Sequence, residues 1–149
     1  MNFNELCDAG KNCYEQGNFN EALDFLNKAL ELKPNETNAL TGKGFCLMDM
    51  KQYESAIQIF DQLLEINEND VRALFQKGCC LTESDKYEQA IQIFDKVIAI
   101  HPEDARTHYK KGFCLFRIER FAGAAECFEK ATALNENDVN SFMYAGLCY

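Results

Sequence analysis

Residues 71–104 read VRALFQKGCCLTESDKYEQAIQIFDKVIAIHPED and contain two helical patterns in succession. Apolar residues recur at helical spacing in residues 71–84 and again in residues 87–100. A short polar turn around Asp85 separates the two patterns. Asp104 is placed to cap the helix that follows, because an Asp side chain accepts hydrogen bonds from the free amide groups of a first helical turn. The stretch therefore predicts an antiparallel pair of helices.

The same pattern returns along the whole chain with a period of 34 residues. The columns that carry the period are Gly10, Gly44, Gly78, Gly112 and Gly146, then Phe19, Tyr53, Tyr87 and Phe121, then Ala22, Ala56, Ala90 and Ala124. A single helix pair cannot bury its apolar face alone, so a tandem array of pairs predicts a solenoid with one continuous core. We expect one domain over residues 1–149, with repeats at 3–36, 37–70, 71–104 and 105–138 and a partial repeat at 139–149.

The repeat resembles the tetratricopeptide repeat over essentially the whole chain. It shares the 34-residue period, the order Gly-x-x-Leu/Cys, then Tyr/Phe-x-x-Ala, and an occasional Pro at Pro34 and Pro102. It departs from the family in lacking a Trp in the early aromatic column and in having Glu68 and Glu136 in place of Pro. The resemblance implies an all-α fold, a right-handed solenoid of antiparallel helix pairs with four full repeats plus one extra C-terminal helix. It also implies a scaffold for protein–protein interaction.

Composition and charge narrow the classes of function. The 149 residues are 47% hydrophobic and include 24 acidic against 15 basic side chains, for a net charge of −9. A chain of this sign is not expected to bind nucleic acid or an anionic membrane, which need a basic surface. There is no run of 18 apolar residues and no secretory signal at the N-terminus, and none of the 8 Cys forms a C-x-x-C pair. We therefore expect a cytoplasmic protein.

The sequence shows no constellation for catalysis, a metal or a cofactor. The only histidines, His101 and His108, fall in a turn and in a packing column, with no nucleophile paired to either. Four cysteines share one column, at Cys46, Cys80, Cys114 and Cys148. Equivalent positions in stacked repeats lie about 8–10 Å apart, too far for one zinc site or a disulfide. We predict small buried cysteines and no enzyme; a reactive thiol at Cys79, on the predicted inner face, is the alternative.

The resemblance implies that the first helix of each repeat lines the concave face of the array, where we expect a peptide segment or a partner helix to bind. The candidate peptide-binding residues are Phe45, Met48, Arg72, Phe75, Gln76, Arg106, Tyr109, Lys110, Phe113, Phe116 and Arg117. Aromatic rings left mostly exposed among Arg and Lys are typical of interaction sites. They predict a protein or peptide partner with apolar anchors and at least one acidic group. The alternative is that single aromatics pack between neighbouring helices.

One partner known for the family is not expected. Tetratricopeptide co-chaperones hold the C-terminal carboxylate of heat-shock chaperones with Lys, Asn and Arg side chains on successive first helices. The matching places here are Cys7, Lys11, Gly42, Arg72 and Gln76, or, one repeat later, Thr41, Phe45, Gln76, Arg106 and Lys110. The carboxylate clamp is incomplete in both frames.

The last helix predicts an open end. Phe142, Leu147 and Tyr149 lie on faces that a following helix normally covers. Either the chain is a fragment of a longer array, or it forms a homo-oligomer through this end. A third possibility is that the array is a non-catalytic arm of a larger enzyme.

Overall fold

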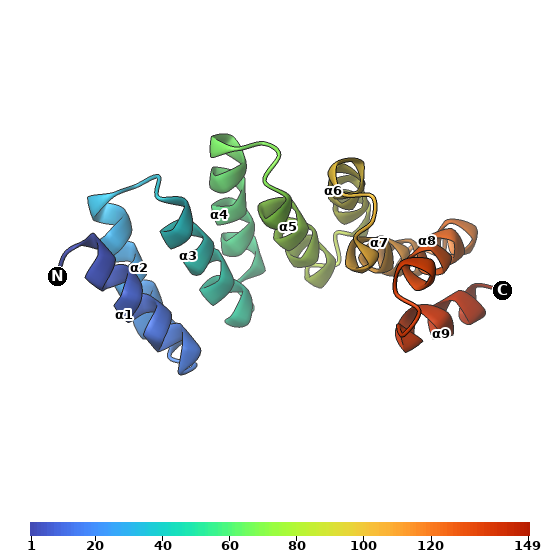
Figure 1. The fold of residues 1–149 in the computed structure, drawn as a ribbon, viewed down its shortest axis with the longest axis horizontal. Helices are drawn as coiled ribbons and strands as arrows, with labels where there is room; N and C mark the ends of the chain where they lie inside the picture. Colours follow the sequence, from blue (N-terminus) through green and yellow to red (C-terminus); the bar gives the residue numbers. More distant parts are fainter. The chain divides into compact units, whose positions relative to one another are not determined.

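The computed structural model describes residues 1–149 and contains nine α-helices and no strands (Figure 1). The helices are α1 (Phe3–Glu15), α2 (Phe19–Leu32), α3 (Thr37–Asp49), α4 (Tyr53–Ile66), α5 (Val71–Glu83), α6 (Tyr87–Ile100), α7 (Ala105–Arg117), α8 (Phe121–Leu134) and α9 (Val139–Cys148). The odd-numbered helices each begin 34 residues after the previous one. The predicted all-α fold is thereby confirmed.

The chain forms two compact units, which we call unit 1 (Met1–Ala73) and unit 2 (Leu74–Tyr149). In unit 1, α1 packs on α2 and α3, and α3 packs on α2 and α4. In unit 2, α7 packs on α6 and α8, and α8 packs on α9. The helices α3 in unit 1 and α7 in unit 2 therefore each lie beside both the helix before and the helix after.

At three members of the glycine column, Gly44, Gly78 and Gly112, an aromatic ring lies directly on the helix backbone, whereas Gly10 faces the Leu26 side chain. A β-carbon added at Gly44 would lie 2.8 Å from Cζ of Phe60, and one at Gly78 would lie 2.5 Å from Cε1 of Phe94. Both rings are almost completely buried. No side chain larger than hydrogen fits between ring and helix, so the glycine sets how closely the two helices of a pair approach.

Small residues occupy the other points of close approach. Ala22, Ala56, Ala90 and Ala124 have no exposed surface, and the same holds for Cys46, Cys80 and Cys114. All eight cysteines are free thiols. The prediction that this cysteine column consists of small buried residues is confirmed for its first three members, whereas Cys148 is partly exposed.

The turn inside each helix pair closes on a residue with left-handed backbone. These residues are Gly17, Lys51, Asp85 and Glu119, with φ of 79°, 59°, 58° and 62°. The next amide donates to a carbonyl five residues earlier, for example from Asn18 to Cys13 at 2.8 Å. This arrangement satisfies carbonyl groups at the end of the first helix. Only Gly17 is a residue that favours this conformation, so the sequence pattern does not predict the motif in the other three repeats.

Gly78→Ala tests the contact between glycine and ring. The added methyl group meets the buried Phe94 ring at 2.5 Å, well inside van der Waals contact. We expect overpacking to lower the free energy of unfolding toward the upper end of about 1–3 kcal/mol. Alanine's better helix propensity offsets up to about 1 kcal/mol of that loss. Urea unfolding followed by circular dichroism measures the difference.

Gly123→Ala in α8 is the matched control, because a methyl group there lies 3.5 Å from the Leu115 side chain, an ordinary contact. This control should leave stability unchanged or raise it by up to about 1 kcal/mol. If Gly78→Ala is as stable as Gly123→Ala, the ring does not set the helix spacing.

Candidate functional site

The predicted inner-face aromatics are half-buried, so the expectation that they are mostly exposed is wrong. Phe45 meets Phe60 edge to face with ring centroids 6.4 Å apart, and Phe75 meets Phe94 at 6.0 Å. A ring on a first helix is long enough to reach the buried ring of the second helix of its own pair. The alternative, packing between neighbouring helices, therefore applies to these side chains.

An arginine lies over each of two inner-face rings. The Arg72 guanidinium is 5.0 Å from the ring centroid of Phe45 in unit 1, and Arg106 is 5.0 Å from that of Phe75 in unit 2. Both arginines are exposed. A cation over an aromatic face at this distance is attracted by about 0.5–1 kcal/mol at an exposed site. Each arginine is thus held over a ring while its side chain stays exposed to solvent.

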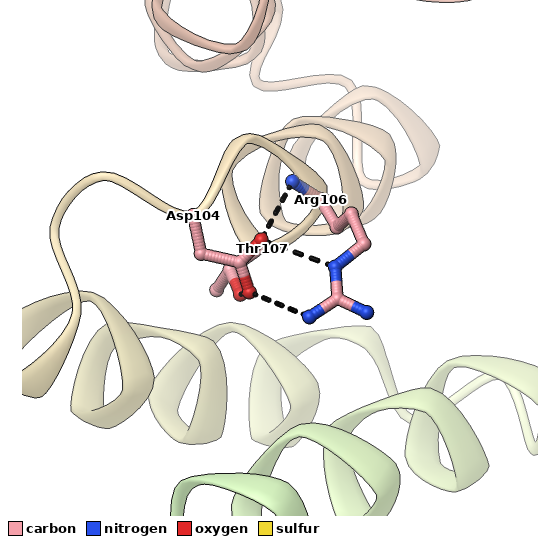
Figure 2. A network of polar contacts seen from close by, with 3 residues as sticks. All are labelled: Asp104, Arg106 and Thr107. Carbon is pink, nitrogen blue, oxygen red and sulfur yellow. Dashed lines mark hydrogen bonds and ion pairs between the residues drawn. The ribbon is translucent and has the colours of Figure 1, made fainter. Parts of the chain in front are cut away.

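Arg106 is also fixed by the residue that caps α7 (Figure 2). The Asp104 carboxylate accepts from the Arg106 backbone amide at 3.1 Å, from its side-chain Nε at 3.2 Å and from Thr107 Oγ1 at 3.0 Å. Burial opposes ionisation of Asp104, but the hydrogen bonds from Arg106 and Thr107 outweigh it and lower the pKa of the carboxyl. The predicted capping role of Asp104 is confirmed, and its charge neutralises Arg106.

A ring from α9 covers the inner face of unit 2. Tyr144 stacks on Phe128 with centroids 5.3 Å apart and planes 20° apart. The rings of Tyr109, Phe113 and Phe116 surround it at 6.1, 6.1 and 5.5 Å. Three of the predicted peptide-binding residues therefore belong to a packed cluster, which we call the Tyr144 nest. Its central residue was not among the predicted site residues.

Unit 1 instead contains a pocket of about 560 Å³. Its lining includes Cys7, Lys11 and Tyr14 of α1, Leu26 of α2, Gly42 and Phe45 of α3, and Arg72. Two of the predicted site residues, Phe45 and Arg72, thus lie together at one pocket. The volume lies in the range of sites for small ligands and side chains.

The polar groups of the pocket differ in how they are held. The Tyr14 hydroxyl donates to Asp49 at 2.5 Å, and this bond raises the pKa of Tyr14 to about 12. The Nζ atom of Lys11 lies 3.9 Å from Oε1 of Glu15, and both side chains are largely exposed. Arg72 has no carboxylate partner among residues 1–149. The pocket therefore offers a fixed phenol ring and an arginine whose charge is not neutralised.

Two family models match this sequence. The model described as tetratricopeptide repeat matches residues 14–76. The model described as anaphase-promoting complex, cyclosome, subunit 3 matches residues 49–131, more than half of the chain. The chain belongs to the tetratricopeptide-repeat family. Members of this family are typically non-catalytic scaffolds for protein–protein interaction.

Solved tetratricopeptide structures superpose on the chain. MamA 41-end from Desulfovibrio magneticus RS-1 has a TM-score of 0.93 and 25% identity, over 98% of this chain and 82% of that one. YrrB, described as a TPR protein with an unusual peptide-binding site, has a TM-score of 0.83 and 20% identity, over 97% and 74%. PilF of Pseudomonas aeruginosa has a TM-score of 0.83 and 24% identity, over 98% of this chain and 67% of that one. The likeness to YrrB and PilF shows the fold alone. No curated protein matches the chain.

The remaining predicted peptide-binding residues of this tetratricopeptide chain are spread over both units. Met48 lies half-buried on α3 in unit 1. In unit 2, Gln76 and Lys110 are half-buried, and Arg117 lies 5.3 Å over the Tyr87 ring. Lys11, Tyr14 and Gly42 line the pocket; they occupy inward positions of the first helices but were not among the candidate peptide-binding residues. A comparison of equivalent repeat positions could have indicated two of them, because Phe113 and Phe116, three periods after Lys11 and Tyr14, were candidate residues.

The histidines and Cys79 occupy structural positions. His108 is buried, and its Nε2–H donates to the Pro102 carbonyl at 2.7 Å, which ties the turn to α7. His101 is exposed. Burial raises the pKa of the Cys79 thiol to about 11, so little of the nucleophilic thiolate is present near neutral pH. The structure therefore disfavours a reactive thiol at Cys79.

The last helix exposes the residues predicted for self-association. Phe142, Leu147 and Tyr149 are 55%, 62% and 86% exposed, and the Tyr149 hydroxyl donates to Glu129. Self-association through this face stays a prediction. None of the nine helices combines the length and apolar character that crossing a membrane requires.

Asp104→Ala tests the cap that also positions Arg106. We expect a loss of about 1 kcal/mol in the free energy of unfolding at pH 7, the usual value for a cap. The folded pKa of Asp104 is below its ordinary value of 3.8, so its contribution is present above that value and disappears as pH falls through the folded pKa. Urea unfolding at pH 7 and at about pH 2 should show the difference between variant and wild type shrinking.

Glu103→Ala is the control for this cap, because Glu103 is the exposed neighbour of Asp104. It should change stability little at either pH. A stability difference for Asp104→Ala that stays constant down to the lower pH contradicts the argument.

Proposed function

We propose that this chain is a protein-interaction scaffold whose inner face binds a peptide segment with apolar anchors and an acidic group. The observation that carries the proposal is the pocket of unit 1, where the Tyr14 and Phe45 rings lie beside the unpaired charge of Arg72. Aromatic and arginine side chains are the residue types that dominate binding energy at protein interfaces. The tetratricopeptide family supports a protein partner. The description of YrrB supports a peptide as the form in which that partner binds.

The pocket is built to bind without rearrangement. Phe45 is held by Phe60, Tyr14 by its bond to Asp49, and Arg72 by the ring of Phe45. Side chains fixed before binding lose little conformational entropy when the partner arrives. The helices that carry them are rigid elements, so the anchors of the peptide meet a preformed surface.

The charge at the pocket differs in sign from the net charge of the whole chain, and this difference favours an acidic partner. The chain carries a net charge of −9, which repels acidic peptides at long range. At the pocket, Arg72 and Lys11 outnumber the one acidic lining residue, Asp8, although Lys11 also pairs with Glu15. An acidic group beside the apolar anchor therefore determines where along the chain the peptide binds.

Free cysteines throughout the chain are compatible with our proposed cytoplasmic location, where thiols stay reduced.

Selection from a random peptide library displayed on phage tests this proposal. Wild type should enrich peptides that combine an aromatic or aliphatic residue with Asp or Glu. Arg72→Glu should weaken those peptides at least about tenfold, because the charge that attracts the acid is reversed. Isothermal titration with the synthetic peptides measures the affinities.

Lys96→Glu on α6 is the matched control, since it makes the same charge reversal at an exposed position of a second helix. It should leave the affinities unchanged. If no peptide is enriched, or if Arg72→Glu binds as well as the control, the inner face of unit 1 is not the binding surface.

Self-association is a second candidate, favoured by the exposed apolar face of α9. Val139, Phe142, Met143 and Leu147 are each more than half exposed on this one helix. Exposed apolar patches of this kind are typical of interaction sites. A second copy of the chain is the partner that this candidate requires, and the mass of the particle reports it directly.

Sedimentation equilibrium over a range of concentrations tests self-association. Wild type should exceed 17.0 kDa as concentration rises. Phe142→Glu combined with Leu147→Glu should keep the mass at that of one chain, because two carboxylates cannot be buried unpaired. Asn140→Glu, on the same helix, is the control and should behave like wild type. A wild-type mass that does not change with concentration rejects this candidate.

A further inference from the structure

The pocket of unit 1 and the Tyr144 nest of unit 2 are built from the same positions of the repeat. Tyr144 lies three periods after Gly42. Its four ring neighbours, Tyr109, Phe113, Phe116 and Phe128, lie three periods after Cys7, Lys11, Tyr14 and Leu26. All five of the earlier residues line the pocket. One unit therefore shows the site filled, and the other shows it empty.

The substitutions between the two sets explain why the pocket exists. Gly42 has no side chain where Tyr144 supplies a ring, and Leu26 replaces the ring of Phe128 beneath it. Cys7 is much smaller than its counterpart Tyr109. The space that a tyrosine ring occupies in unit 2 is therefore open in unit 1, and its walls stay largely apolar.

We infer that the pocket of unit 1 receives an aromatic side chain of a partner peptide, in the place that Tyr144 occupies in unit 2. This inference rests on the proposed function and names the anchor that the pocket takes. The ring of Tyr14 takes the part that Phe116 plays against Tyr144 in unit 2. Ring pairs of this geometry add more favourable binding free energy than their buried area alone provides, which favours an aromatic anchor over an aliphatic one.

The charges at the pocket place an acidic residue next to that aromatic anchor. Lys11 stands where the nest has the apolar Phe113, and Arg72 lies over Phe45 at the same pocket. Asp8 also lines the pocket and repels a carboxylate on its side, so the acidic residue lies toward Arg72. The occupant is a peptide containing Tyr or Phe beside Asp or Glu.

Two short peptides that differ in one side chain test the anchor. Acetyl-Gly-Tyr-Glu-Gly-amide is titrated into the ¹⁵N-labelled chain, and acetyl-Gly-Ala-Glu-Gly-amide is titrated in parallel. The tyrosine peptide should shift the amide signals of Thr41, Gly42 and Phe45. The alanine peptide should bind at least about tenfold more weakly, because it lacks the ring. Equal affinity for the two peptides, or no shift at these amides up to millimolar peptide, overturns the inference.

Gly42→Tyr fills the pocket from within, in imitation of Tyr144. The new β-carbon lies 3.3 Å from the end of the Leu26 side chain, which lines the pocket. Thr41→Tyr, which imitates Tyr109 two periods later, is a second way of filling the same space. Each variant should abolish the shifts caused by the tyrosine peptide. If Gly42→Tyr does not fold, as judged by circular dichroism, Thr41→Tyr decides the outcome.

Gln58→Tyr on the exposed side of α4 is the control, since it adds the same ring away from the pocket. It should bind the tyrosine peptide as wild type does. If the filled variants also bind like wild type, the aromatic anchor is rejected. The proposed function then still stands if library peptides need Arg72, and it fails separately if wild type enriches no peptide at all.

Discussion

The contact between a helical glycine and the phenylalanine ring of the paired helix is the constraint on which the rest of the structure depends. At Gly44, Gly78 and Gly112 a ring presses on the backbone where no β-carbon fits. This contact fixes the distance between the two helices of a pair, and it leaves the rings of Phe60, Phe94 and Phe128 fully buried. The helices keep their spacing whatever side chains face inward, so the inner positions are free to differ from one repeat to the next.

That freedom explains how one architecture produces both a packed nest and a pocket. The inner positions of unit 2 carry rings that pack around Tyr144. The inner positions of unit 1 carry Cys7 and Gly42, and a cavity remains over Leu26. Under the proposed function, recognition by this chain depends on residues that the fold does not require. The arginines then add charge, and only Arg106 is neutralised by a neighbour, Asp104.

Much of the fold could be predicted from the sequence, because its causes are local or periodic. Helices at residues 71–83 and 87–100 follow from apolar spacing, and the cap at Asp104 follows from one side chain and the amide beside it. The site was less predictable, because the exposure of an inward side chain depends on the side chains of the neighbouring helix that pack against it. Phe45 was expected to be mostly exposed, but it reaches Phe60. The role of Gly42 emerges only by comparison with Tyr144, and a single sequence pattern does not say which of two repeats is filled. The left-handed turns at Lys51 and Glu119 could not be predicted, because neither residue favours that backbone conformation.

The buried cysteines have a consequence for the chain once it leaves its folded state. Burial is the largest cause raising the pKa of Cys46 to about 11 and that of Cys80 to about 12, so folding keeps these thiols protonated and inaccessible. Unfolding restores the ordinary acidity of all eight thiols and exposes them to one another within a single flexible chain. A disulfide formed by air oxidation in that state, between cysteines that lie far apart in the native helices, prevents the chain from refolding. Denaturation of this protein is therefore expected to be reversible only when a reductant keeps the thiols reduced.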